Sequence, residues 1–276
     1  MSAAERTGDV TSVLPEPAQD ERSEFGDSAM LGFQFLLAVV VLFMWQGASG
    51  RLVDDFFVSN PIDVFRRLYT WTANGSIFQH IAATIYETIA GFMIGASMGV
   101  LLGIWLGMSR FYSRLLNPFL WALNALPKVA LAPLFVLWFG LGLESKIALA
   151  AILTLFIVFI NTYQGIKDVD EDLLDTVRLM KATRGQLLRK VILPSSVAWI
   201  FTGFKVALPN ALIGAVIGEM IASSYGLGYL VQLSGAQFDT AGVFAVLFVI
   251  GILAVILNQL IEMAHSRLDH WRVLNR

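Results

Sequence analysis

The chain has 276 residues, of which 57% are hydrophobic and 14% are charged, and its mean hydropathy is +0.69. Soluble domains carry about 25% charged residues, so this composition leaves too few charges to cover a water-facing surface. It predicts helices that have lipid as their solvent. The absence of cysteine excludes disulfides, thiolate metal sites and cysteine nucleophiles. The net charge of −2 is uninformative, because in a membrane protein the placement of charge matters more than its sum.

The first 28 residues differ from the rest of the chain. They contain seven acidic residues, two arginines, two prolines and few apolar residues. Such a segment buries too little surface to offset its ordering entropy, so we expect a disordered tail over residues 1–28. It does not resemble a signal peptide, because no basic region runs directly into a short apolar core with a small-residue cleavage site.

Six apolar segments follow, and each approaches the roughly 20 residues that a helix needs to cross a bilayer. The third is interrupted by Pro118, Pro127 and Pro133, and the fifth contains Lys205 and Glu219. The sequence therefore predicts an all-α membrane domain over residues 29–268, with a short tail at residues 269–276. The predicted spans are Met30–Ala48, Ile81–Met108, Leu115–Phe139, Ile147–Ile166, Ala198–Ala222 and Ala241–Ala264.

Lysine and arginine placement orients these spans. If the N-terminus lies in the cytoplasm, thirteen basic residues fall in cytoplasmic segments and only four in outer segments. The outer four are Arg51, Arg66, Arg67 and Lys146. Since positive charge concentrates on the cytoplasmic side, we expect both termini in the cytoplasm.

The loop between the fourth and fifth spans, residues 168–196, is unusually charged and patterned. Its first half has apolar residues at helical spacing, and Thr183 with Gln186 forms a potential capping box for a second helix. Pro194 is expected to end that helix. We expect two short helices whose apolar faces pack on each other and on the bundle, so that the corner at residues 181–185 projects. The packing residues are predicted to be Leu173, Val177, Met180, Leu187 and Val191.

This loop resembles the cytoplasmic "EAA" loop of permease subunits in bacterial ABC importers, whose signature opens on EAA, continues with a glycine and closes on V-x-L-P. Here the close is "VILP", Val191 to Pro194, and its spacing from Asp175 matches. Two parts of the signature differ here: EAA is replaced by Asp-Thr-Val, and Lys181 stands at the usual glycine. Residues 56–68, 125–142 and 218–231 are similar to the branch of this family that carries sulfonates, taurine and nitrate.

The resemblance implies a bacterial inner-membrane subunit that pairs with a second permease subunit, expected to be a second copy of this chain, and with ABC ATPases. It also implies a periplasmic or lipid-anchored solute-binding protein. ATP and Mg²⁺ would bind to the partner ATPase; no cofactor, metal or nucleic acid is expected on this chain. The residues that would contact the ATPase are Asp175, Thr176, Val177, Arg178, Lys181, Ala182, Thr183, Arg184, Gly185 and Gln186. A basic amphipathic loop also suits a lipid surface, so that reading stays open.

A glycine recurs at every fourth position of the second span. The residues are Gly91, Gly95, Gly99, Gly103 and Gly107. Such a stripe lets another helix approach closely, so we expect packing against a neighbouring span or the second permease subunit. Making room for a substrate is the alternative.

Polar residues within the spans are candidates for the translocation path, because an intramembrane charge costs several kcal/mol and defaults to a buried or cavity-facing position. Lys205 could instead extend to the lipid headgroups, and Glu219 could serve a structural pairing. The candidates are Lys128, Asn161, Lys205, Asn210 and Glu219.

No catalytic site is recognisable in the sequence. It contains no G-x-x-x-x-G-K-[ST] loop, no HExxH and no serine–histidine–acid pattern. The resemblance, together with the positive charges of Lys128 and Lys205, implies a non-catalytic permease that carries a small anion, such as a sulfonate, taurine, nitrate or a similar carboxylate. An ion-coupled secondary carrier and an integral membrane enzyme are the alternatives; the carrier would need its own coupling site, and no clear inverted repeat is visible.

Overall fold

The computed structural model describes residues 27–52 and 54–269, and this part of the chain consists of helices joined by turns, with no strand. The predicted tails, apart from residues 27, 28 and 269, lie outside the described residues. Two units are distinguished, divided between Ala48 and Ser49. The first contains α1 (Asp27–Ala48), an apolar helix whose described side chains are mostly exposed.

The second unit contains all remaining helices. The short or interrupted ones are α2 (Asp55–Val58), α3 (Pro61–Ala73), α5 (Arg110–Ala125), the 3₁₀ turn η1 (Lys128–Leu131), α6 (Ala132–Phe139), α8 (Glu171–Leu179), α9 (Arg184–Leu187), the π-helical η2 (Leu188–Ile192) and α11 (Leu227–Ala236). The long ones are α4 (Ser76–Met108), α7 (Leu143–Lys167), α10 (Leu193–Ala222) and α12 (Thr240–Asp269).

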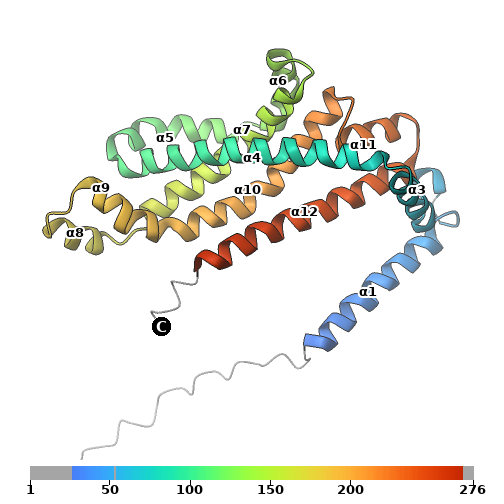
Figure 1. Ribbon diagram of the computed structural model, residues 1–276, viewed down its shortest axis with the longest axis horizontal. Helices are drawn as coiled ribbons and strands as arrows, with labels where there is room; N and C mark the ends of the chain where they lie inside the picture. The colour runs from blue at the N-terminus through green and yellow to red at the C-terminus, as the bar shows by residue number, and fades with distance from the viewer. Residues whose placement is uncertain (1–26, 53, 270–276) are drawn as a thin grey trace, which may run out of the picture. The chain divides into compact units, whose positions relative to one another are not determined.

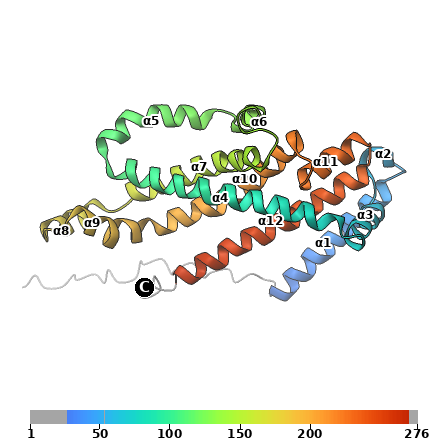
Figure 2. The same cartoon turned by 45° about the horizontal axis from the view of Figure 1, so that its top comes forward.

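The long helices α4, α7, α10 and α12 lie side by side, with α3 and α11 at one end and α8 and α9 at the other (Figures 1 and 2). Helix α10 contacts the other three. One apolar core joins α10, α11 and α12 around Leu212, Leu227 and Val246. Many large apolar side chains on the outer faces remain exposed, as expected where lipid replaces water.

Five of the described helices are long and apolar enough to cross a membrane, and a sixth span is possible if the bent pair of α5 with η1–α6 counts as one. The predicted third span therefore differs from a simple helix: its two halves meet at 81°. Pro127 lies at the break and has no N–H to continue the helical hydrogen bonds of α5. Pro133 occupies the first turn of α6, where a missing N–H is tolerated.

The glycine stripe of α4 faces α7, as predicted for packing against a neighbouring span. A Cβ added at Gly99 would lie 2.8 Å from the Leu155 carbonyl oxygen and 2.9 Å from Val158 Cβ. At Gly103 it would lie 2.6 Å from Thr162 Cβ. Gly91, Gly95 and Gly107 are equally crowded by α7. The stripe allows two helix backbones to touch along most of their length.

Candidate functional site

The loop between α7 and α10 contains the two helices predicted from the sequence. Asp170 caps α8 by accepting a hydrogen bond from the Asp172 N–H at 2.8 Å. Thr183 and Gln186 form the predicted capping box at α9: the Gln186 N–H donates to Thr183 Oγ1 at 3.3 Å, and the Thr183 N–H donates to Gln186 Oε1 at 2.8 Å. The sequence therefore defines both helix starts locally.

An apolar base packs α8, α9 and η2 against the ends of α4 and α7. The buried members are Ile166, Val169, Leu187 and Ile192. Leu174, Val177, Leu188, Val191 and Ile104 pack against them. Val177, Leu187 and Val191 thus pack as predicted. The prediction for Leu173 and Met180 was wrong, since these side chains are 45% and 77% exposed. Helix α8 has only nine residues and turns Leu174, not Leu173, toward the bundle.

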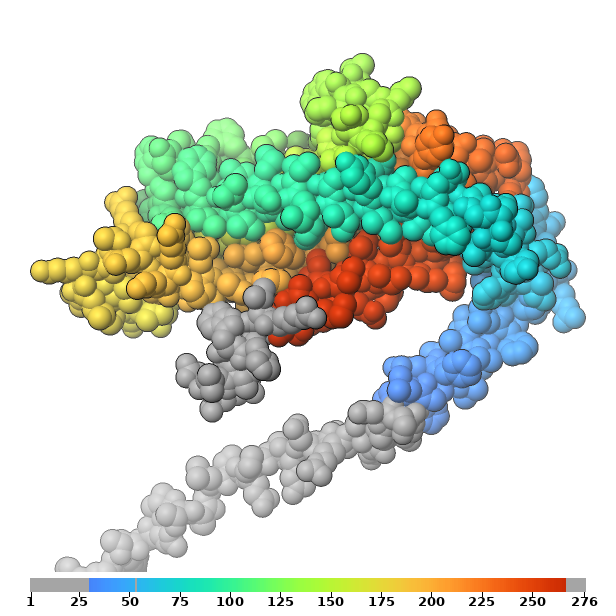
Figure 3. Space-filling model, viewed as in Figure 1, coloured from blue at the N-terminus to red at the C-terminus, as the bar shows by residue number. Residues whose placement is uncertain are grey.

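The tip of the loop projects beyond the neighbouring helices (Figure 3). Leu179 is 86% exposed next to Met180, and Gly185 has open space where a Cβ would stand. Lys181 connects the two helices with φ of +58°, in the left-handed region that glycine adopts most readily. The EAA signature has a glycine at this position. Here a lysine occupies it, and the backbone still adopts the left-handed conformation.

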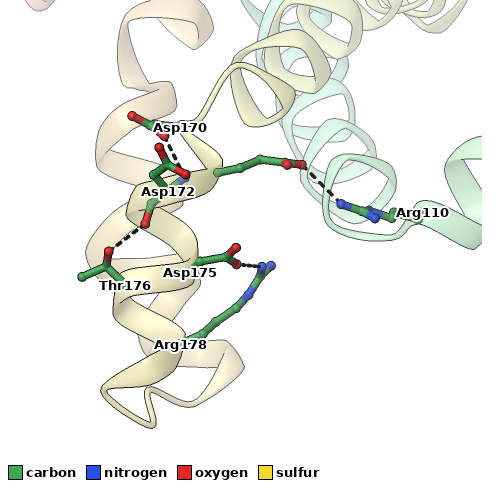
Figure 4. Close-up of polar contacts among 7 residues, drawn as sticks. Arg110, Asp170, Asp172, Asp175, Thr176 and Arg178 are labelled. Carbon is green, nitrogen blue, oxygen red and sulfur yellow. Dashed lines mark hydrogen bonds and ion pairs between the residues drawn. The ribbon is translucent and has the colours of Figure 1, made fainter.

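Charged side chains of α8 form two exposed ion pairs, one within the helix and one with Arg110 of α5 (Figure 4). Arg178 Nη1 lies 2.7 Å from Asp175 Oδ1, and Arg110 Nη2 of α5 lies 3.2 Å from Glu171 Oε1. All four side chains are more than half exposed. Exposed pairs of this kind contribute about 0–1 kcal/mol each, so they shape the surface of the loop more than they stabilise it.

Pro194 does not end the second helix, contrary to the prediction. Helix α9 continues through η2 into α10, and residues 184–222 form one continuous helical segment. Within η2 the Leu193 N–H donates to the Leu188 carbonyl, one residue further back than in an α-helix. Pro194 then occupies the first turn of α10. The wider π turn accommodates the proline, which would otherwise clash with the preceding turn.

Lys128 lies at the break of the bent pair. Its ammonium group donates to the Asn124 carbonyl at 2.7 Å and to Asn124 Oδ1 at 3.1 Å, and it lies 4.9 Å from the centroid of the Phe156 ring. The side chain is half-buried. The Lys128 side chain thus remains partly accessible next to non-helical backbone. In membrane proteins, non-helical backbone at this depth is tolerated where it is buried in protein or lines a water-filled cavity.

The other predicted path residues have separate partners in this structure. Asn161 and Asn210 each donate to a carbonyl of their own helix at 2.8 Å. Lys205 Nζ of α10 lies 2.5 Å from Glu262 Oε2 of α12. Glu219 is fully buried near α11. The five candidates therefore do not form one cluster.

A buried polar cluster lies at the end of the bundle opposite the α8–α9 loop. Glu219 accepts hydrogen bonds from Thr84 Oγ1 at 2.6 Å and from the Gly228 N–H at 2.7 Å. Glu87 and Lys146 complete the cluster and are 1% and 2% exposed. Lys146 Nζ donates to the carbonyls of Leu141 and Gly142 at 2.7 and 2.9 Å. Lys146, which was expected in an outer segment, thus belongs to α7 and is buried within the bundle.

Comparison with known proteins identifies the family. Residues 99–271 match the family model described as "Binding-protein-dependent transport system inner membrane component". The chain belongs to this family. It is an ABC transporter permease and a multi-pass protein of the inner membrane. The family implies ATPase and solute-binding partners.

Several relatives match almost the whole permease. An aliphatic sulfonates transport permease of Bacillus subtilis is 30% identical over 99% of this chain and 98% of its own length. A riboflavin transport system permease of Chloroflexus aurantiacus is 33% identical over 97% and 98% of the two chains. A formylaminopyrimidine transport permease of Halalkalibacterium halodurans is 32% identical over 86% and 94%.

Solved structures share the fold of the permease. An inward-facing form of the MetNI methionine ABC transporter superposes with a TM-score of 0.60 at 20% identity, covering 72% of this chain and 96% of that chain. An amino acid ABC transporter solved with histidines gives a TM-score of 0.57 at 16% identity, covering 69% and 92%. At this identity the likeness supports the fold alone.

Sequence reasoning missed most of the buried cluster of the permease. Glu87 is an ionisable residue inside the second predicted span, and the rule that selected Lys128 would also have selected it. Thr84 gives no signal in the sequence, because its partners are 135 and 143 residues away along the chain. His80 is 6% exposed and accepts a hydrogen bond from the Gly226 N–H at 3.1 Å.

Proposed function

We propose that the permease forms the translocation path of an ATP-driven importer for a small organic or inorganic anion, such as a sulfonate, taurine, nitrate or a similar carboxylate. ATP and Mg²⁺ bind to partner ATPase chains, and this subunit is non-catalytic. The observation that carries the proposal is the α8–α9 loop: an apolar base anchors it, and a shaped tip with Leu179 and Met180 projects. Methionine and other apolar side chains are favoured in the cores of protein interfaces, so this tip suits a groove on a folded partner.

The distribution of basic residues supports placing this tip in the cytoplasm. Lys181, Arg184, Arg189 and Lys190 all lie in or next to the loop, and positive charge is concentrated on that side. With six spans, both termini share the side of the loop. The α11 end of the bundle then faces outward, where a loaded binding protein docks. Two copies of the permease, each holding one ATPase, complete the assembly.

The preference for an anion rests on Lys128. Placing a cation within the membrane costs free energy, so such a residue is expected at a functional position. At a break between helices, its positive charge attracts anions. The Bacillus subtilis relative, whose name refers to aliphatic sulfonates, agrees with an anion. Relatives named for riboflavin and formylaminopyrimidine show that similar permeases serve other solutes, so the binding protein that delivers the solute decides among them.

The docking of the tip is tested at Gly185. A tryptophan there has open space in the free permease, so the fold should tolerate it. In a fitted groove, overpacking costs about 1–3 kcal/mol, which weakens capture of the ATPase by about tenfold or more. Gly185→Ala is the matched control and should capture the ATPase normally. Equal capture by both variants would show that this corner does not enter the partner.

Reconstituted transport tests the function itself. Liposomes with permease, ATPase and loaded binding protein should take up a labelled sulfonate, taurine or nitrate only when ATP is present. Uptake by the permease alone, driven by an ion gradient, would instead support a secondary carrier.

A further inference from the structure

The N-terminus of α11 is capped by side chains from other helices. A helix leaves its first N–H groups without intrahelical partners, and the residue before α11 is Gly226, which has no side chain to offer. The Gly226 N–H donates to His80 Nδ1 at 3.1 Å, and the Leu227 N–H donates to Thr84 Oγ1 at 2.8 Å. The Gly228 N–H donates to Glu219 Oε2 at 2.7 Å. Three consecutive donors are therefore held by α4 and α10.

Thr84 connects these contacts. Its hydroxyl accepts from the Leu227 N–H and donates to Glu219 Oε1 at 2.6 Å. The carboxylate of Glu219 thus holds α11 once directly, through Gly228, and once through Thr84. A carboxylate is also favoured at a helix N-terminus by the helix dipole. Thr84 and Glu219 are fully buried, and a buried polar group that loses its partner costs about 1–3 kcal/mol.

The two glycines of the turn are required by this arrangement. Gly226 has φ of +106°, which L side chains rarely adopt. A Cβ at Gly228 would lie 2.9 Å from Glu219 Cβ. Only a backbone without side chains brings these N–H groups so close to the carboxylate.

Lys146 extends the cluster to a second segment. Its ammonium group binds the carbonyls of Leu141 and Gly142 in the turn between α6 and α7. Its side chain packs on α10, since a Cβ at Gly218 would lie 2.9 Å from Lys146 Cγ. Lys146 therefore ties the α6–α7 turn to α10, the helix that carries Glu219.

We propose that this cluster is a latch that makes α11 a rigid part of the bundle, and that Thr84 is the positioning residue on which the latch depends. Resting on the proposed function, in which this end faces outward, the latch transmits the docking of a loaded binding protein to α4 and α10. Helix α11 then moves together with these helices, and it is not a lid that opens by itself.

The test compares two substitutions of Thr84. Thr84→Val keeps the shape but removes the hydroxyl, which leaves the Leu227 N–H and Glu219 Oε1 without this partner. Thr84→Ser keeps the hydroxyl and is the rescue control. The chain has no cysteine, so a single Ser234→Cys serves as a probe: Ser234 lies in α11 and is 4% exposed. The rate of maleimide labelling is measured on purified permease in nanodiscs.

Slow labelling is expected for the parent and for Thr84→Ser, and labelling about tenfold faster for Thr84→Val. In the assembled transporter, Thr84→Val should keep basal ATP hydrolysis but lose most of its stimulation by loaded binding protein, and Thr84→Ser should retain both. Equal labelling of the Val and Ser variants, or fast labelling of the parent, would overturn the latch. An absence of stimulation in the parent would instead count against the proposed function, while labelling still decides on the latch.

Discussion

The contact between α4 and α7 predicts opposite effects for one substitution at two glycines. Gly99 lies in the stripe that faces α7, whereas Gly251 lies in α12 with no atom within 4 Å of an added Cβ. Both are inside α-helices. Replacing glycine by alanine in a helix gains about 0.5–1 kcal/mol from backbone entropy. That gain applies at both positions, so a difference between them measures packing.

At Gly99 the added methyl group meets backbone that cannot rotate away. It would lie 2.8 Å from the Leu155 carbonyl oxygen, 2.9 Å from Val158 Cβ and 3.0 Å from the Phe159 nitrogen. Non-bonded carbon contacts are optimal near about 3.5–4.0 Å, so the two helices must separate by more than half an ångström. Overpacking of this kind costs about 1–3 kcal/mol, which exceeds the entropic gain.

We therefore expect Gly99→Ala to lower the thermal unfolding midpoint of the purified permease in detergent, and Gly251→Ala to leave it unchanged or raise it. At about 2–4 °C per kcal/mol for a chain of this size, the two variants should differ by several degrees. Fluorescence-detected size exclusion after heating measures both. If Gly99→Ala were as stable as Gly251→Ala, the close approach of α4 and α7 would be wrong.

Three further predictions concern the loop, the break and the topology. Lys181→Gly should preserve capture of the ATPase, because glycine favours the left-handed backbone at this position; Lys181→Val should weaken it, because β-branched residues avoid positive φ, and equal capture would contradict the role of the bend. Lys128→Met should reduce anion uptake about tenfold or more while basal ATP hydrolysis persists, since charged hydrogen bonds are worth about 1.5–3 kcal/mol. Lys128→Arg is its control, and normal uptake by the methionine variant would make this lysine structural. A reporter that is active only in the cytoplasm should function after Met180 and not after Gln237; activity at both sites would refute the orientation.

The features that the sequence predicted well are those that depend on residues close together in the chain. The capping box of Thr183 and Gln186 spans one helical turn, and the glycine stripe needs only a period of four residues. The long spans follow from apolar length alone. Each of these patterns has few competing structural solutions, because the helix itself fixes the geometry.

The features that were missed depend on contacts between distant residues. Nothing near Thr84 indicates that it will bind Leu227, which lies 143 residues later. Lys146 was placed in an outer segment because a charge at the end of an apolar run resembles a loop residue, yet its partners are carbonyls that only the α6–α7 turn presents. Leu173 was assigned to the buried face although a helix of nine residues allows either neighbouring face to pack, and Met180 was assigned to it although it lies just beyond the end of α8, in the turn.

The two ends of the bundle are held by different forces. Apolar packing anchors the α8–α9 loop, and a buried polar latch holds α11. Helices α4 and α7 connect these ends, and their backbones are in contact along the glycine stripe, which resists bending of either helix alone. Helix α10 also connects them, but it follows the π-helical η2 and contains Pro209, which removes one internal hydrogen bond. We therefore expect the α11 end, where the latch joins α4 to α10, to move as one unit, while the loop moves relative to it by bending of α10 near η2 and Pro209.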